Sequence, residues 1–198
     1  MEARLHESIT RWNLLDSKFY QAWSAGALPV EALRDYAHEY GAFISLIAKG
    51  WEAHGDDATA AVEREHVELW NDFAASLGTA IGAPKTAAVV RKLRETADRL
   101  FSERASSLGA LYAFEAQQPA TSQSKLEGLR AHYKLGAKAE TYFDVHKDDD
   151  EEPRLLLQRM TALSPADRAI AAEACETMCG LLRGALDELY ERHVVCMN

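Results

Sequence analysis

The sequence lacks several features that would each point to a broad class of protein. No run of apolar residues approaches the roughly 20 that a helix needs to cross a bilayer, so we expect no membrane partner. The formal net charge is -9, which argues against a general nucleic-acid surface, because such surfaces are basic. The first residues, MEARLHESITRW, contain no apolar core of a signal peptide. We therefore expect a cytoplasmic protein.

Cysteine is also scarce, with only Cys175, Cys179 and Cys196. An odd, late cluster in a chain of 198 residues is not a disulfide framework, which fits a reducing compartment. Cys175 and Cys179 share a helical face and could bind a metal or react, but free cysteine usually packs as a small apolar residue. Glycine-rich phosphate loops, Gly-x-Ser-x-Gly elbows and Cys-x-x-Cys pairs are absent, so none of these motifs indicates a function.

What the chain does contain is helical periodicity. Apolar residues make up 47% of it and recur at steps of three and four, as on a helix packed on one side. No alternation of β-branched residues predicts a strand. We expect a single all-α domain over residues 1–198, a bundle of about seven helices with short connections. The predicted helical stretches are 5–24, 30–53, 58–77, 86–102, 106–118, 121–134, 137–149, 153–162 and 165–193.

Prolines and caps predict where several of these helices end. Pro119 should kink or break its helix, because proline has no backbone N–H and its ring crowds the preceding turn. Pro153 interrupts the chain again, and the acidic run 148–152 lies where a helix N-terminus would favour negative charge. Ser164 and Pro165 are typical of the N-cap and the first position of a helix.

Two stretches carry side chains typical of a metal site in a helical bundle. VEREHVELW at 62–70 contains Glu63 and His66, a Glu-x-x-His pair of the kind that di-metal carboxylate bundles use. YAFEAQQP at 112–119 contains Glu115 amid apolar residues. An unpaired carboxylate is costly to bury there, and a cation would offset that cost.

A third stretch, TYFDVHKDDDEEP at 141–153, adds His146 and Asp150. Their spacing places both on one face of a continuous helix. Carboxylates supply the charge that two divalent ions need, and imidazoles complete the coordination, so the three stretches together predict an iron site. Simpler interpretations stay open: a packed core histidine at His66, a solvated Glu63, and a surface pair of His146 with Asp150.

Four segments together resemble the haem-oxygenase-like di-iron oxidases, which share their fold with the TenA and PqqC relatives. The resemblance is greatest to the CADD-type proteins, which make para-aminobenzoate, and it extends from about residue 14 to 180. The matching segments are LDSKFYQAWSAGALPVEALRDYAHEY at 15–40, HVELWNDFAASLG at 66–78, LYAFEAQQPATSQSKLEGLRAHY at 111–133 and ETYFDVHKDDDEE at 140–152.

The resemblance implies a haem-oxygenase-like bundle that holds two iron ions, with manganese as an alternative metal. It also implies dioxygen and a small molecule as substrates, an external electron donor and a homodimer. Carried over by position, the metal ligands would be His66, Glu115, His146 and Asp150, with Glu63 in the Glu-x-x-His position that some relatives use.

Two positions depart from the family pattern. CADD-type proteins carry a glutamate seven residues before the first histidine, where this chain has Thr59. The last histidine of their His-x3-Asp-x2-His motif is replaced by Pro153, which cannot bind a metal. We therefore expect one firm metal position and one weak position. The firm one would use His66, Glu115 and His146, and the weak one Asp150, Glu63 and either Glu151 or Glu152.

The CADD-type proteins resemble self-sacrificing enzymes, in which a tyrosine of the protein becomes the product and a lysine is implicated as the nitrogen donor. The matching positions here are Tyr20, in KFYQAW, and Lys125, in QSKLEGL. The simpler interpretation is that the aromatic motif around Tyr20 packs the fold. Helical phase cannot place Lys125 relative to the metal, because Pro119 lies between it and Glu115.

The broad prediction is an oxidase that activates dioxygen and oxidises a small amino-acid-like or fatty-acid-like molecule. Para-aminobenzoate formation is the narrower prediction. A metal-free member of the fold that binds an organic ligand is the alternative, given the departures at Thr59 and Pro153. A TenA-type hydrolase would need a cysteine in its pocket, and the cysteines here lie only in the last helix and the tail.

Overall fold

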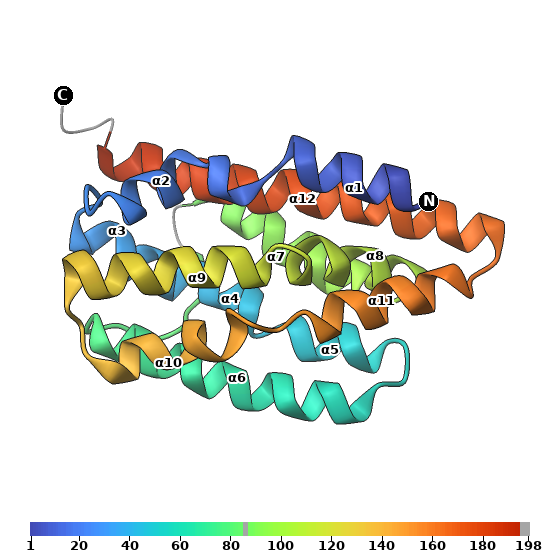
Figure 1. Ribbon diagram of the computed structural model, residues 1–198, viewed down its shortest axis with the longest axis horizontal. Helices are drawn as coiled ribbons and strands as arrows, with labels where there is room; N and C mark the ends of the chain where they lie inside the picture. Colours follow the sequence, from blue (N-terminus) through green and yellow to red (C-terminus); the bar gives the residue numbers. More distant parts are fainter. Residues whose placement is uncertain (85–86, 195–198) are drawn as a thin grey trace.

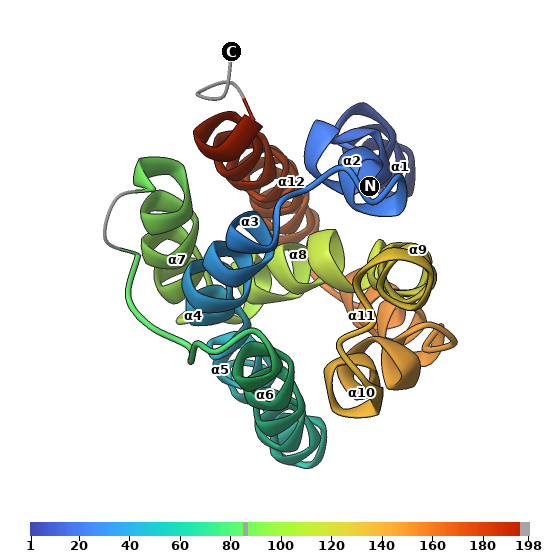
Figure 2. The ribbon, with the colours of Figure 1, turned by 90° about the vertical axis from the view of Figure 1, so that its left-hand side faces the viewer.

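Helix α8 (Arg104–Glu115) lies at the centre of the fold (Figure 2). Its sequence, RASSLGALYAFE, is buried on nearly every side, as expected for a helix without a charged face. It therefore carries Glu115, at its C-terminal end, into the interior. The helices packed against α8 are α5 (Ile47–Glu52), α7 (Ala88–Leu100), α9 (Gln118–Gly128), α11 (Glu151–Thr161) and α12 (Pro165–Val194).

The structure, a computed structural model, describes residues 1–84 and 87–194. Within these ranges it contains helices and turns but no strand, which confirms the all-α prediction. In the same ranges no helix combines the length and apolarity needed to cross a membrane. Residue 86, the first of the expected helix 86–102, and Cys196 lie outside the described residues. The other helices are α1 (Glu2–Arg11), α2 (Lys18–Ser24), α3 (Val30–Asp35), α4 (Gly41–Ile44), α6 (Asp57–Ser76) and α10 (Ala137–His146), with a 3-10 turn at Leu14–Asp16 and π-helical turns at Tyr36–Tyr40 and Leu129–Tyr133.

Two small residues let α8 approach its neighbours closely. A side chain at Gly109 would collide with the backbone carbonyl of Ala171 on α12, so α8 and α12 meet nearly backbone to backbone at this point. The hydroxyl of Ser107 donates a hydrogen bond of 2.6 Å to the carbonyl of Gly50 on α5. These contacts fix the position of α8 from both sides.

The predicted helix over residues 5–24 is wrong in its middle. α1 ends at Arg11, and α2 begins only at Lys18. Between them the Asn13 side chain accepts from the N–H of Leu15 at 3.0 Å, and the Ser17 hydroxyl accepts from the N–H of Tyr20 at 3.2 Å. Such polar side chains compete with the helix for backbone donors, so they replace one long helix by two short ones.

The proline at 119 marks a helix break, as predicted, but the break comes earlier. α8 ends at Glu115, and Pro119 lies in the first turn of α9. Proline is tolerated there because the first N–H groups of a helix have no partner within the helix.

Pro153 behaves in the same way, and here the prediction of a helix at 137–149 is wrong at its C-terminal end. α10 ends at His146, and Pro153 lies in the first turn of α11. Asp150 is therefore the N-cap residue of α11. His146 and Asp150 do not share a helical face, because the helix stops between them.

Helices α6 and α10 pack side by side, and α11 continues from α10 towards α8 (Figure 1). α12 follows along the length of the molecule (Figure 1). Its start agrees with the prediction, since the Ser164 hydroxyl accepts from the N–H of Asp167 at 3.2 Å. The three sequence stretches with metal-ligating residues therefore lie on neighbouring helices.

Candidate metal centre

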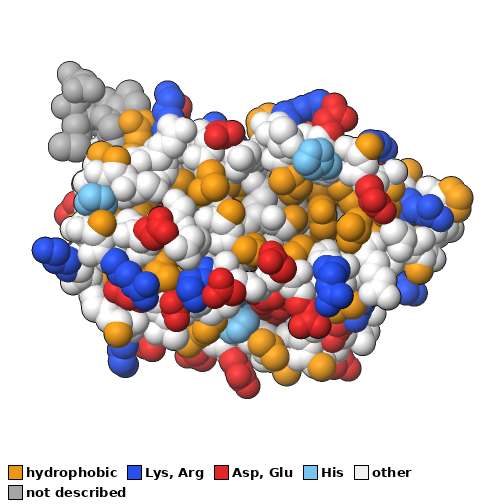
Figure 3. Space-filling model, in the orientation of Figure 1, with side chains coloured by type: hydrophobic (Ala, Val, Ile, Leu, Met, Phe, Trp, Pro, Cys, Tyr) orange, Lys and Arg blue, Asp and Glu red, His pale blue; other side chains and the backbone are white. Residues whose placement is uncertain are grey.

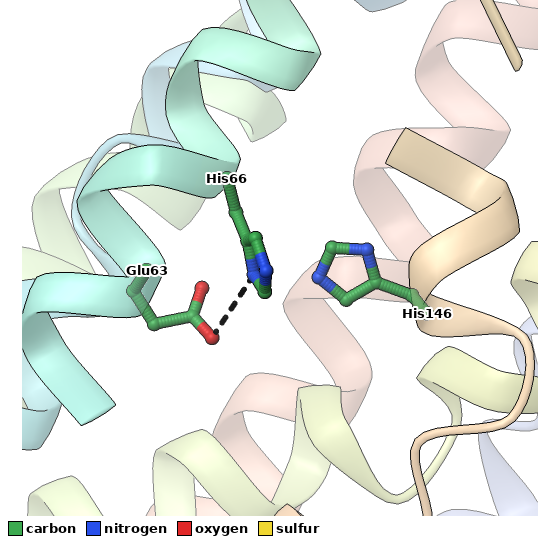
Figure 4. Close-up of side chains that lie close together, drawn as sticks. All are labelled: Glu63, His66 and His146. Carbon is green, nitrogen blue, oxygen red and sulfur yellow. Dashed lines mark ion pairs between the residues drawn. The ribbon is translucent and has the colours of Figure 1, made fainter. Parts of the chain in front are cut away.

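Glu63, His66 and His146 meet between α6 and α10, and we call them the histidine group. Their candidate ligand atoms all lie within 4.8 Å of one another. The Nδ1 of His66 is 3.6 Å from the Oε1 of Glu63. The two imidazole rings lie edge to face, with centroids 4.4 Å apart and ring planes 70° from parallel (Figure 4). Three ligands from two helices, with both imidazoles pointing at the carboxylate side, form half of a coordination sphere.

Glu63 belongs to a second group, together with Glu115 and Glu152, which we call the carboxylate group. Their ligand atoms also lie within 4.8 Å of one another. Glu63 comes from α6, Glu115 from the end of α8 and Glu152 from the first turn of α11. The two groups therefore adjoin through one shared carboxylate, which is the arrangement that a pair of bridged metal ions needs.

A backbone hydrogen bond fixes the orientation of His146. Its Nδ1 donates to the carbonyl of Tyr142, at 2.5 Å, so Nε2 carries the free lone pair. The Tyr142 ring packs against the imidazole with centroids 4.2 Å apart, and its hydroxyl accepts from Gln118 at 2.9 Å. Burial lowers the pKa of His146 to about 4. The imidazole is therefore neutral near pH 7, the form that binds metals.

Electrostatic repulsion is strong in the carboxylate group. Burial, followed by the nearby charges of Glu152 and Glu63, raises the pKa of Glu115 well above its usual value. Burial and the charges of Glu63 and Asp149 raise the pKa of Glu152 to about 9. Carboxylates crowded in this way either hold protons or bind a cation, because a cation would remove the repulsion that produces these shifts.

The buried polar atoms of the centre fit a metal better than they fit each other. Glu63 Oε1, His66 Nδ1 and Glu115 Oε1 are buried and have no hydrogen-bond partner within the described residues. Such unpaired groups are rare in folded interiors and costly to maintain. Ligation would use all three atoms, and the mixture of imidazoles and carboxylates suits iron or manganese.

Asp150 is not brought to the centre. It lies exposed at the start of α11, and its neighbour Glu151 is exposed as well. Acidic side chains gather at the surface around this junction of α10 and α11 (Figure 3). Because α11 begins at Glu151, it is Glu152 that turns inward. Of the two substitutes considered for the missing histidine, the structure brings Glu152 into the carboxylate group.

The two departures from the family pattern have plain structural roles here. Thr59, in place of the family glutamate, lies in the first turn of α6, where its N–H donates to Asp56 at 3.0 Å. Pro153 lies next to Glu152 in the first turn of α11. Neither residue belongs to a candidate ligand group.

Tyr20 and Lys125 lie together in the core. The Lys125 ammonium is 5.1 Å from the centroid of the Tyr20 ring and 4.9 Å from that of Phe143. The Tyr20 hydroxyl lies 3.0 Å from that of Tyr36. Burial lowers the pKa of Lys125 to about 7 and raises that of Tyr20. In the part of the chain that the structure describes, no hydrogen bond or ion pair joins the Tyr20 or Lys125 side chain to the metal groups.

Sequence reasoning missed two features of the site. Gln118 holds the Tyr142 hydroxyl, and nothing in the spacing of Gln118 points to that contact. The sharing of Glu63 between the two groups was also missed, since we expected Glu115 to belong with the histidines. The Glu-x-x-His spacing marked Glu63 as a ligand but carried no information about which neighbours it would meet.

Known proteins match most of the chain in sequence. The chain is 27% identical to a 4-aminobenzoate synthase of Chlamydia pneumoniae over 204 residues, 90% of this chain and 91% of that one. It is 26% identical to a 4-aminobenzoate synthase of Nitrosomonas europaea, covering 94% of this chain and 88% of that one.

Solved structures show the same fold. A TenA homologue from Pseudomonas syringae matches with a TM-score of 0.76 at 14% identity, covering 96% of this chain and 92% of its own. A CADD-like protein of unknown function from Nostoc punctiforme matches with a TM-score of 0.62 at 17% identity, covering 98% of this chain and 97% of its own. These matches confirm the haem-oxygenase-like, TenA-like architecture.

A family model described as "Iron-containing redox enzyme" matches residues 20–182. That range includes both metal groups together with Tyr20 and Lys125. The chain belongs to this family of haem-oxygenase-like, iron-containing redox enzymes.

Proposed function

We propose that the chain is an oxidase that activates dioxygen at two metal ions, one bound by the histidine group and one by the carboxylate group. The observation that carries this proposal is the sharing of Glu63 by two sets of converging ligands. The single domain over residues 1–198, the homodimer, the cytoplasmic location and the external electron donor remain predictions.

The side chains of the centre have separable roles in this proposal. Glu63 belongs to both groups and would help to hold each ion. His146 presents Nε2 because its Nδ1 is bound to the Tyr142 carbonyl. Glu115, which is 2% exposed, would hold the ion of the carboxylate group from the inner side. When bound, a pair of ferrous ions supplies the electrons that reduce dioxygen.

For the substrate, we propose the 4-aminobenzoate route as the first candidate to test. It is supported by the names of the relatives and by the contact of Lys125 with the Tyr20 ring. With its pKa lowered to about 7, a large share of the Lys125 amine is uncharged at neutral pH and therefore nucleophilic. An oxidase acting on a separate small molecule at the same centre is the broader form of the proposal.

The metal proposal is tested by adding ferrous iron to the metal-free protein without oxygen. We expect about two ions per chain, and consumption of dioxygen when air is admitted. A chain that binds no iron and consumes no dioxygen would instead be the metal-free ligand-binding alternative.

The substrate proposal is tested with protein carrying ¹³C in its tyrosines and ¹⁵N in its lysines, assayed by mass spectrometry for labelled 4-aminobenzoate. Tyr20→Phe and Lys125→Met should abolish the labelled product while leaving iron binding intact. Tyr133→Phe is the matched control, since Tyr133 is a half-buried tyrosine outside the metal groups. If the wild-type protein yields no labelled product but consumes dioxygen, the substrate is a separate molecule.

A further inference from the structure

Arg159, on α11, forms hydrogen bonds with the segment that joins α5 to α6. Its guanidinium donates to Asp56 Oδ2 at 2.6 Å and to His54 Nδ1 at 2.5 Å. It also lies over the Trp51 ring, 5.9 Å from the centroid. Burial, and then the charge of Arg159, lowers the pKa of His54 to about 4, so His54 can accept this hydrogen bond as a neutral ring. We call these four residues the Arg159 clamp.

Asp56 gives the clamp a second function. Its Oδ1 accepts from the N–H of Thr59 at 3.0 Å and so caps α6, while its Oδ2 binds Arg159. Asp56 lies seven residues before Glu63, and Arg159 lies seven residues after Glu152. Seven residues are about two helical turns, so one contact holds both helices at the same distance from their metal ligands.

The first turn of α11 needs a contact that fixes the position of Glu152. Glu152 is in the carboxylate group with Glu63 and Glu115, and Asp149 adds a further negative charge. Without a metal, those of these carboxylates that are ionised repel one another. Leu156 and Met160 are buried on the same helix and set which face of α11 turns inward. The two hydrogen bonds of Arg159, one of them to the Asp56 carboxylate, add a directed contact to this packing.

We propose that Arg159 is a positioning residue for the second metal site: by clamping α11 to the N-cap of α6, it holds Glu152 within reach of Glu63 and Glu115. This inference rests on the proposed metal centre, and its test separates the two. Arg159 itself belongs to neither metal group, so its substitution removes no ligand and acts through the positions of the helices that carry them.

The chain offers a matched control on the same helix. Arg154 is exposed, and among the described residues its one ion pair is with Glu151, one turn away at 3.8 Å. Substituting Arg154 removes one positive charge from α11 without touching the clamp. Asp56→Asn is a second probe, because asparagine keeps the oxygen that caps α6 but loses the negative charge that binds Arg159.

The experiment measures iron binding without oxygen, by calorimetry and elemental analysis, in wild type, Arg159→Leu, Asp56→Asn and Arg154→Leu. For Arg159→Leu and Asp56→Asn we expect an affinity loss of about 10- to 100-fold for one of the two ions, the usual effect of losing an outer partner, and little change for the other ion. Amide hydrogen exchange on the metal-free proteins should be faster over residues 148–156 in these two variants. Arg154→Leu should match wild type in both measurements.

Each outcome has one meaning. Wild-type binding of both ions by Arg159→Leu and Asp56→Asn overturns the positioning role, and so does an equal loss of both ions, which would indicate a general loss of structure. If wild type binds no iron, the proposed function fails, and the exchange measurement still decides whether Arg159 holds α11. In that case, unchanged exchange over residues 148–156 overturns the clamp as well.

Discussion

The two halves of the metal centre are built differently. The histidine group takes its ligands from α6 and α10, two regular helices that pack side by side. The carboxylate group needs a third and a fourth element: the buried end of α8 and the first turn of α11. One half depends on spacing within helices, and the other depends on where helices end.

The difference indicates how the proposed two-ion site forms without the family's last histidine. In the histidine group, the His146 imidazole is neutral and oriented by its bond to the Tyr142 carbonyl, ready for a cation. In the carboxylate group, burial and then neighbouring charges raise the pKa values of Glu115 and Glu152. We therefore expect the second ion to bind more weakly, because protons compete for its ligands.

The largest effect on metal binding is expected at Glu63, because it belongs to both ligand groups. Glu63→Gln removes a ligand from both groups at once, so we expect the affinity for both ions to fall by more than about 100-fold, beyond the loss expected for an outer partner. Iron per chain, measured after desalting, checks this. Glu65→Gln, an exposed position on the same helix, is the control and should retain both ions. Retention of one ion by Glu63→Gln would show that Glu63 serves one group only.

Substitutions in only one of the two ligand groups should have the next largest effect on metal binding. His146→Gln should remove one ion and leave the other, and Glu152→Gln should do the converse. The readout is the ultraviolet and near-infrared absorption of bound cobalt(II), which differs between nitrogen-containing and all-oxygen sites.

Asp150→Asn distinguishes the ligands that the structure brings together from the ligands that the family pattern implies. Since Asp150 is exposed, its substitution should leave both ions bound. Loss of an ion in Asp150→Asn would instead support the ligand that the family pattern implies.

The pH dependence of the metal-free protein is a smaller effect. Glu115 and Glu152 have pKa values raised in the folded state, against about 4.3 in the unfolded chain. Above that value the folded protein holds more protons than the unfolded one, so stability falls as pH rises towards about 9. The contribution of these two groups to the Tm in the presence of a chelator should therefore be smaller at pH 8.5 than at pH 5, and the difference between wild type and Glu115→Gln isolates it.

Glu115→Gln should flatten this profile, because glutamine has no proton to lose. At high pH a gain of 1 kcal/mol would appear as a Tm increase of about 2–4 °C in a protein of this size. Glu65→Gln again serves as the control. A Tm difference between wild type and Glu115→Gln that is the same at pH 5 and at pH 8.5 would contradict the crowding of the three carboxylates.

The smallest expected effect concerns the cysteines. Cys175 and Cys179 are buried on α12 with their sulfurs 4.0 Å apart, and neither belongs to the metal groups. Cys179→Ala should cost about 1 kcal/mol of stability, as a core substitution of modest size does, and leave iron content unchanged. Thermal unfolding and elemental analysis check both statements. A loss of iron in this variant would place the thiols at the metal centre.

Much of the fold and half of the site could be predicted from the sequence. Glu63 and His66 lie within one long helix, so their spacing fixed their relation. The apolar neighbours of Glu115 marked it as a candidate ligand, because burying a carboxylate costs free energy unless a partner or a cation compensates for it. Both inferences use only local periodicity and burial, which the sequence expresses directly.

The other half could not be predicted, because it depends on helix ends. Whether Asp150 or Glu152 faces inward is decided by α10 stopping at His146 and α11 starting at Glu151. The proline at 153 indicated that a helix changes there, but not on which side of it. The split of residues 5–24 has the same origin, since the caps at Asn13 and Ser17 outweighed the apolar stripe. Contacts between distant segments, such as Arg159 with Asp56, leave no mark in spacing.

The close approach of α8 to α12 at Gly109 also bears on how related sequences can be read. Glu115 lies six residues beyond this glycine on the same helix, so the width of the gap there sets how deep the carboxylate reaches. A bulkier residue at 109 would lift α8 and withdraw Glu115 without altering any ligand. A tyrosine three residues before the glutamate is easily noticed in a family signature. A small residue at the position of Gly109, three residues before that tyrosine, is the better indicator that a relative keeps the carboxylate of Glu115 in place.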